Sequence, residues 1–293
     1  MRNRDTSVLG RLRADAILDR VGGEDALRAV AGTQMDVNGM KPTRVMMSRI
    51  TLIVGMAAAS VYGQQPLAGG KVVTFTTADG VELVGTYYAP TGRAISPAAI
   101  LMPSYRSRRM RYRLLIPRLH DAGFAILTVD PRGQGDSVKP ARLKLAERLL
   151  RRDKQLMRDM YKDVEAAVEW VRKQPNVDPK RLVLVGSSLT ASVAFDYAGR
   201  HPVNAVVGLS PRKSFAGLDA IKLLEKAKGT PVLLMGTQRD RDSCEQIASG
   251  FDDVQVQILG GTTRAHGTRM FGRVEGAEQI LVDYLSSNVT DTE

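Results

Sequence analysis

The chain has 293 residues, of which 43% are hydrophobic and 25% are charged, and its formal net charge is +11. This composition suits one sizeable globular domain with additional sequence. A single cysteine, Cys244, excludes a disulfide framework and a cysteine-based metal site. The positive charge is compatible with a nucleic-acid partner, but no zinc-finger spacing, helix-turn-helix pattern or interleaving of basic and aromatic residues supports one.

Residues 40–63 have the order of a secretory signal peptide that begins near Met40. Three basic residues precede an uncharged apolar stretch, residues 50–61, and small or polar residues follow. The apolar stretch is shorter than the ~20 residues that a spanning helix needs. We therefore expect cleavage after Ser60 or Gly63, giving a secreted or periplasmic protein without a stable membrane span after processing.

Residues 1–39 are rich in Arg and Asp and show no pattern of a packed unit. We interpret them as an over-extended start or as disordered sequence. The alternatives for the apolar stretch behind them are an uncleaved signal anchor or a buried helix of a cytoplasmic protein. Residues 64–293 are expected to form a single domain.

Within this domain, strand patterns alternate with helix patterns. Residues 71–76 and 81–88 flank an Asp-Gly turn and predict a hairpin. Further strands are predicted at residues 98–102, 125–130, 182–185, 205–209, 232–235 and 254–259, and helices at residues 114–122, 143–173 and 276–286. The alternation predicts an α/β fold: a mostly parallel central sheet with helices on both faces and an antiparallel N-terminal hairpin.

The turn after the strand predicted at residues 182–185 is the most informative motif. A run of Leu and Val stops at Gly186, and Ser187 and Ser188 open a predicted helix. The segment nearly spells Gly-x-Ser-x-Gly, the nucleophile elbow of serine hydrolases, but Thr190 stands in place of the last glycine. Ser188 is the candidate nucleophile, and an ordinary helix cap is the alternative. The register of Ser187 after Gly186 does not fit the elbow.

Two further reactive residues follow the ends of later strands. Asp240 follows residues 232–235 and His266 follows residues 254–259. Ligands of parallel sheets bind at the carboxyl ends of the strands, so Ser188, Asp240 and His266 are expected to meet there. A histidine base activates a serine hydroxyl, and a carboxylate orients that histidine. Asp242 is the alternative acid.

The remaining candidates have simpler interpretations. His120 lies on a predicted helix and is interpreted as a surface or packing residue, and His201 lies at the end of the helix that follows the elbow. Cys244 is interpreted as a packing residue. Thr190 adds a branched side chain at a crowded position, which is either accommodated by local repacking or distorts the oxyanion hole.

From about residue 71 to its C-terminus the chain resembles the α/β-hydrolase superfamily. Besides the ordered Ser, Asp and His, the resemblance rests on four short segments: residues 75–81 (FTTADGV), 130–137 (DPRGQGDS), 209–211 (LSP) and 265–268 (AHGT). The chain is most similar to small, uncapped bacterial serine hydrolases related to the dienelactone-hydrolase-like esterases.

The resemblance implies a role for each matching position. Ser188 matches the nucleophile, Asp240 the triad acid and His266 the base. The backbone N–H of Leu189 matches one oxyanion donor, and the second is expected from Tyr105. In that second loop Pro103 stands where the family often has histidine.

The function expected from these residues is hydrolysis of a small-molecule carboxylic ester through an acyl-enzyme, without a metal or organic cofactor. A peptidase or thioesterase is the alternative among enzymes, and a catalytically inert scaffold that binds a ligand or partner is the alternative outside them. An arginine cluster is interpreted as a solvated helix face or as a rim that attracts anionic substrates; it consists of Arg106, Arg108, Arg109, Arg111, Arg113 and Arg118. The sequence predicts no oligomeric state.

Overall fold

The computed structural model describes residues 69–92, 94–260 and 265–289. The expected over-extended start (residues 1–39) and signal peptide (residues 40–63) lie outside these residues, so both stay predictions. In the part of the chain that the structure describes, no helix combines the length and the apolar character needed to span a membrane.

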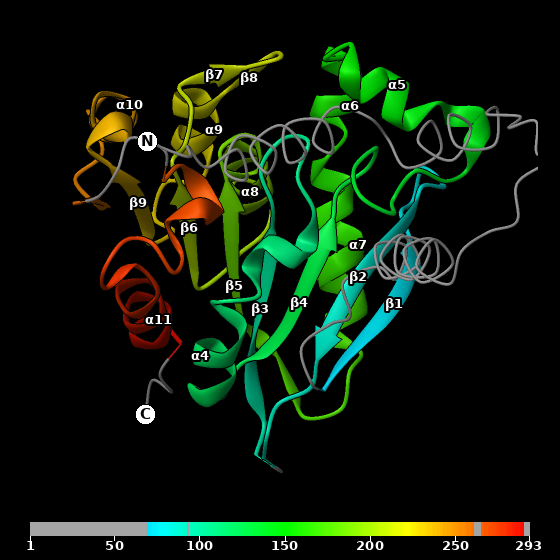
Figure 1. The fold of residues 1–293 in the computed structure, drawn as a ribbon, viewed down its shortest axis with the longest axis horizontal. Coiled ribbons are helices and arrows are strands. Elements are labelled where there is room, and N and C mark those ends of the chain that lie inside the picture. The colour runs from blue at the N-terminus through cyan, green and yellow to red at the C-terminus, as the bar shows by residue number, and fades with distance from the viewer. Residues whose placement is uncertain (1–68, 93, 261–264, 290–293) are drawn as a thin grey trace, which may run out of the picture. The chain divides into compact units, whose positions relative to one another are not determined.

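The centre of the described domain is an eight-stranded sheet with the order β1-β2-β4-β3-β5-β6-β9-β10 (Figure 1). The bounds are β1 Gly70–Thr76, β2 Glu82–Tyr88, β3 Ser96–Met102, β4 Ala125–Asp130, β5 Val177–Ser187, β6 Ala205–Leu209, β9 Val232–Thr237 and β10 Val254–Leu259. Strand β2 pairs antiparallel with both β1 and β4, and the other pairs are parallel. The predicted parallel sheet with an antiparallel N-terminal hairpin is confirmed.

Burial along the strands explains why the central ones read as continuous apolar runs. Every residue of β4, β6 and β9 is buried, because helices cover both faces of the sheet there. The edge strand β10 is only partly buried and alternates polar with apolar residues. In β3 the side chains alternate between two cores: Ile100 and Met102 belong to one, and Ala99 and Leu101 to the other.

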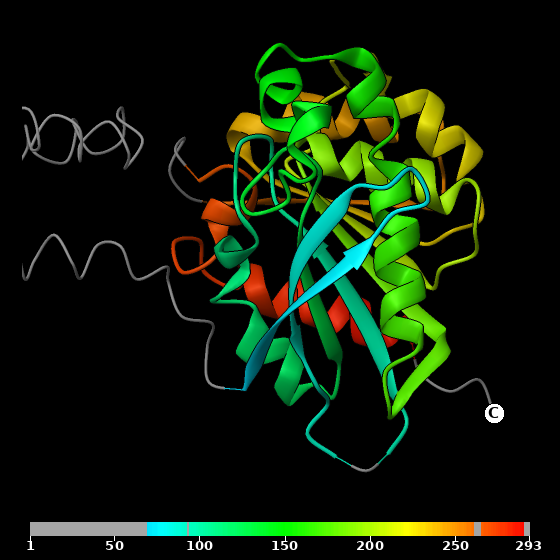
Figure 2. The same cartoon turned by 90° about the vertical axis from the view of Figure 1, so that its right-hand side faces the viewer.

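Helices cover each face of the sheet (Figures 1 and 2). One core contains residues of α7 (Tyr161–Arg172), α8 (Leu189–Ala198), α9 (Ala220–Lys226) and α10 (Arg241–Ala248). The other contains residues of α4 (Ile116–Asp121) and α11 (Ala277–Ser287). This arrangement confirms the predicted fold class.

The prediction of one helix over residues 143–173 is wrong in its continuity. The structure divides this segment into α5 (Leu145–Leu150), α6 (Lys154–Arg158) and α7. Lys144 and Arg152 have φ angles of +47° and +54°, which a helix does not tolerate. Asp153 then begins α6 anew, since its carboxylate accepts a hydrogen bond from the N–H of Leu156 at 2.9 Å.

A small hairpin was also missed, formed by β7 (Ser214–Phe215) and β8 (Leu218–Asp219). Its strands have two residues each, too few for an alternating pattern to be recognised. The hairpin follows the carboxyl end of β6, and the α5–α6 segment follows the carboxyl end of β4. In Figure 1 both are drawn in the upper part of the domain.

The register of the parallel strands aligns the loops that follow them. Met102 pairs with Gly186, and Leu209 pairs with both Ser187 and Met235. The turns after β3, β5, β6 and β9 therefore start at the same level of one sheet edge. These turns carry most of the candidate site.

Candidate active site

Ser188 occupies a strained turn between β5 and α8. Its backbone angles are φ 55° and ψ −107°, which side-chain-bearing residues rarely adopt. The N–H of Ser188 donates a hydrogen bond to the carbonyl of Leu209 at 2.8 Å, and the side chain is nearly enclosed at 6% exposure. A Cβ on Gly186 would lie 2.2 Å from the carbonyl oxygen of Thr190, so only glycine permits α8 to approach β5 this closely.

Thr190 fits this turn through its hydroxyl group. The Oγ1 atom accepts a hydrogen bond from the N–H of Ser187 at 2.7 Å and lies 2.8 Å from the carbonyl oxygen of Met102, to which it donates. The side chain is fully buried. A residue that the sequence marked as a departure from the elbow pattern thus links the elbow to the end of β3.

Asp240 and His266 are in direct contact. His266 Nδ1 lies 2.9 Å from Asp240 Oδ1, although the two residues follow different strands. Asp240 ends the short helical turn Gln238–Asp240 and is buried. Asp242, the alternative acid, lies in the first turn of α10 and is exposed.

The surroundings of Asp240 favour its ionised form. Its Oδ2 atom accepts hydrogen bonds from Ser210 Oγ at 2.8 Å, from the N–H of Thr237 at 3.1 Å and from Thr237 Oγ1 at 3.2 Å. Burial acts to raise the pKa of Asp240, but the hydrogen bonds from His266, Ser210 and Thr237 outweigh it and hold that pKa below the usual 3.8. An ionised carboxylate only accepts hydrogen bonds, so Nδ1 of His266 carries the proton and Nε2 is left as the basic nitrogen.

Ser210 is a member of the site whose role sequence reasoning missed. Its hydroxyl donates to Asp240 Oδ2 and accepts a hydrogen bond from the N–H of Gly267 at 2.8 Å. Its φ angle is +46°, a strained value for serine, and it is fully buried. The only sequence signal was its place directly after a predicted strand, within the Leu-Ser-Pro segment.

The loop that carries His266 lies against the elbow. Gly267 has a φ angle of +57°, and a Cβ there would lie 2.2 Å from Ser187 Oγ and 3.0 Å from Ser104 Oγ. These two hydroxyl oxygens are 2.6 Å apart. Three loops, after β3, after β5 and after β10, thus converge beside Ser188.

The two main-chain N–H groups expected as oxyanion donors belong to Leu189, at the start of α8, and to Tyr105, in the loop after β3. Leu189 is the first residue of α8, so its N–H has no acceptor one turn earlier in the helix. Among the described residues the N–H of Tyr105 has no acceptor either. The Tyr105 hydroxyl donates to the carbonyl of Leu149 at 3.0 Å, which fixes the loop after β3.

The interpretation of the arginine cluster as a solvated face or an anion-attracting rim is wrong for Arg109, which is buried. Its side chain is 9% exposed and forms ion pairs with the fully buried Asp130 and, at 2.7 Å, with Asp136. Its Nε also donates to Thr86 Oγ1 at 3.0 Å. Arg109 therefore anchors the loop after β3, while the other five members of the cluster are exposed.

The other sequence candidates lie elsewhere. His120 Nε2 is 2.7 Å from the carbonyl oxygen of Ala89, and His201 Nε2 is 3.2 Å from Glu165 Oε1. Cys244 is buried in the core, and burial raises the pKa of its thiol to about 12. A thiol with that pKa is not a nucleophile at neutral pH.

The sequence is similar to one protein family and to several known proteins. A family described as "Serine aminopeptidase, S33" matches residues 98–231. An uncharacterised protein of Mycobacterium tuberculosis is 32% identical over 156 residues, which are 53% of this chain and 50% of that protein. The thiohydrolase apmlB of Arthrinium phaeospermum is 29% identical over 224 residues, covering 74% of this chain and 64% of that protein. The chain spans about half the length of the mycobacterial relatives that it matches.

Solved structures match over a larger part of the chain. The dienelactone hydrolase of Anabaena variabilis has a TM-score of 0.58 at 22% identity and covers 76% of this chain and 97% of its own. An esterase of Pyrococcus furiosus has a TM-score of 0.56 at 19% identity, with 75% of this chain and 91% of its own covered. At such identities the likeness shows the fold. With its sheet order and antiparallel entry hairpin, the chain has the α/β-hydrolase fold.

Proposed function

We propose that the protein is a serine hydrolase that cleaves a carboxylic ester through an acyl-enzyme. Ser188 is the nucleophile, His266 the general base and Asp240 the carboxylate that orients it. The hydrogen bond between His266 Nδ1 and Asp240 Oδ1 carries the proposal, since it sets the tautomer that such a base requires. The strained backbone of Ser188, next to the loop of His266, supports the role of that serine.

The proposed reaction has two balanced halves. Ser188 Oγ forms a bond to the ester carbonyl carbon while its proton passes to His266 Nε2. The bond to the alcohol then breaks, and the same proton leaves with the alcohol. Water attacks the acyl group in the second half, gives a proton to His266, and the carboxylic acid departs as Ser188 Oγ recovers its proton.

The negative charge that develops on the carbonyl oxygen needs fixed donors. The N–H groups of Leu189 and Tyr105 are the proposed pair, because neither has a main-chain acceptor in the described structure. Removing one such donor from a hydrolase costs about 3–4 kcal/mol in the barrier. The ion pairs of Arg109 would hold the loop of Tyr105 in place.

A thioester is the second candidate substrate. The relative named as a thiohydrolase matches 74% of this chain, which favours an acyl thioester over an amide. The same three residues serve both reactions, since only the leaving atom changes from oxygen to sulfur. The matching family is described as an aminopeptidase, so an amide is the third candidate substrate to be compared with the ester and the thioester.

The test is turnover of an ester, a thioester and an amide of the same acyl group. We expect hydrolysis of the ester or thioester, and a loss of about 10⁴–10⁶-fold in kcat in Ser188→Ala. Ser192→Ala is the matched control, because Ser192 lies one turn further along α8 and should retain kcat. An absence of turnover of all three compounds by correctly folded wild-type protein would favour the inert scaffold instead.

A further inference from the structure

Two arginines from separate segments lie over one aromatic ring. The guanidinium carbons of Arg152 and Arg212 are 5.6 Å and 5.9 Å from the centroid of the Phe215 ring. Arg152 lies between α5 and α6, and Arg212 lies between β6 and β7. Attraction between a cation and an aromatic face accounts for both contacts. We call these three residues the arginine rim.

The arginine rim adjoins the candidate oxyanion loop. The rings of Phe215 and Tyr105 are 5.0 Å apart and tilted by 55°. Tyr105 directly follows Ser104, whose hydroxyl lies 2.6 Å from that of Ser187 in the elbow. The loop of Tyr105 therefore contacts both the ring of Phe215 and the turn that carries Ser188.

A second connection comes from the loop after β6. Arg212 is two residues beyond Ser210, whose hydroxyl contacts Asp240. Ser243 Oγ donates to the carbonyl of Pro211 at 2.7 Å and so fixes the intervening residue. The arginine rim is thus attached to the site from both sides, through Tyr105 and through Ser210.

The positive charge of the arginine rim is not neutralised within the described residues. Both arginines are exposed, and neither pairs there with a carboxylate. The acidic side chains that are close in sequence to these arginines have other partners: Glu147 pairs with Arg151, Asp153 with Arg148, and Asp219 accepts from the N–H groups of Ile221 and Lys222. A bound anion would supply the opposite charge that these two exposed guanidinium groups lack within the described residues.

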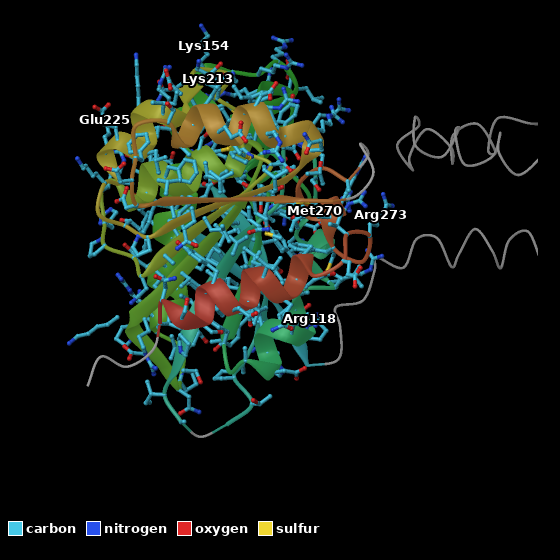
Figure 3. The ribbon with its side chains drawn as sticks, turned by 90° about the vertical axis from the view of Figure 1, so that its left-hand side faces the viewer. Arg118, Lys154, Lys213, Glu225, Met270 and Arg273 are labelled. Carbon is cyan, nitrogen blue, oxygen red and sulfur yellow. The ribbon has the colours of Figure 1, made fainter. Side chains whose placement is uncertain are left out.

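Neighbouring lysines add to the same edge of the domain. Lys154 and Lys213 lie together at the top of Figure 3, whereas Arg118 lies in its lower part. A Cβ on Gly217 would lie 3.3 Å from Lys154 Cγ, so the start of α6 packs against the β7–β8 hairpin. Lys154 and Lys213, which are close in sequence to Arg152 and Arg212, therefore add positive charge beside the arginine rim.

We propose that the substrate carries an anionic group, a carboxylate or a phosphate, beyond the bond that is cleaved. Arg152 and Arg212 bind this group while the acyl carbonyl is presented to Ser188. The arginine fork matches both anions with paired hydrogen bonds. The inference rests on the proposed function and adds the substrate class to it.

The test compares p-nitrophenyl hexanoate with the mono-p-nitrophenyl ester of adipic acid, which has the same chain length and one added carboxylate. We expect kcat/KM to be higher for the anionic ester and to fall about tenfold in Arg152→Gln and in Arg212→Gln. The neutral ester should change less than about twofold, and added salt should reduce the preference. Arg118→Gln removes the same charge at a distance and should leave both values unchanged.

Equal kcat/KM for the two esters, or equal losses in the Arg118 control, would overturn the inference while leaving the serine hydrolase intact. If neither ester is turned over, the proposed function fails, and calorimetric titration of the adipate monoester into Ser188→Ala still decides the inference. Binding that is lost in Arg152→Gln and Arg212→Gln supports the arginine rim, and no binding refutes it. Competition by hexyl phosphate against adipate then distinguishes phosphate from carboxylate recognition.

Discussion

The hydroxyl of Thr190 joins the first turn of α8 to the carbonyl of Met102, the last residue of β3, at 2.8 Å. The same oxygen accepts the N–H of Ser187 at 2.7 Å. The first turn of the elbow helix is therefore tied to the ends of both β3 and β5. The elbow uses a side-chain hydroxyl at a position where its sequence pattern has glycine.

This link predicts the outcome of three substitutions. Thr190→Val keeps the shape but leaves the buried N–H of Ser187 without its acceptor, and we expect a loss of about 1–3 kcal/mol in unfolding free energy. Thr190→Gly, which restores the elbow pattern, should also destabilise, whereas Thr190→Ser should lose least. Urea denaturation measures all three. A glycine variant as stable as the wild type would show that the hydroxyl contributes nothing.

Ser210 is predicted to position Asp240 and the loop of His266. Ser210→Ala and Ser210→Gly both remove the hydroxyl, so kcat/KM for the ester should fall about tenfold in each. Only glycine relieves the φ of +46°, so the glycine variant should be the more stable of the two. If the more stable glycine variant is also clearly more active than the alanine variant, kcat/KM depends on stability and not on the hydroxyl, and Ser210 has a purely structural role.

The lowered pKa of Asp240 has a consequence for stability. Because the folded protein holds this pKa below 3.8, the ionised carboxylate stabilises the fold at all pH values above 3.8. The contribution is lost as the pH falls through the folded pKa. The difference in unfolding free energy between the wild type and Asp240→Asn should therefore be constant from about pH 5 to 7 and shrink below pH 3.8. A difference that grows toward acid pH would contradict the direction of the shift.

We propose that residues 40–63 direct export, as their order of basic, apolar and small residues indicates. Mass spectrometry of the protein purified from its native host should find a mature N-terminus between Ser60 and Gln65. Peptides from residues 1–39 in the mature protein would refute both the start and the cleavage predictions.

The parts of the fold that follow from local patterns were predictable. Buried apolar runs and the Asp-Gly turn identified the strands, and the positions of Ser188, Asp240 and His266 after strand ends indicated one sheet edge. The hydrogen bond from His266 Nδ1 to Asp240 Oδ1 agrees with that placement, and the catalytic roles stay predictions. The helical periodicity of residues 143–173 could not show that Lys144 and Arg152 take left-handed conformations.

The roles that depend on distant partners were not predictable. The role of Ser210 depends on the hydrogen bond that its hydroxyl donates to Asp240, 30 residues later in the chain. Arg109 is buried because Asp130, on β4, neutralises it, which no pattern around Arg109 reveals. The arginine rim likewise joins Arg152, Arg212 and Phe215 only through the tertiary fold.

The central claim is that Ser188 is an activated nucleophile, and covalent labelling by a fluorophosphonate probe tests it most directly. The adduct should map to Ser188 by peptide mass spectrometry, disappear in Ser188→Ala, persist in Ser187→Ala and Ser192→Ala, and form much more slowly in His266→Ala. Labelling that survives Ser188→Ala, or an adduct that maps to Ser187, would contradict the account.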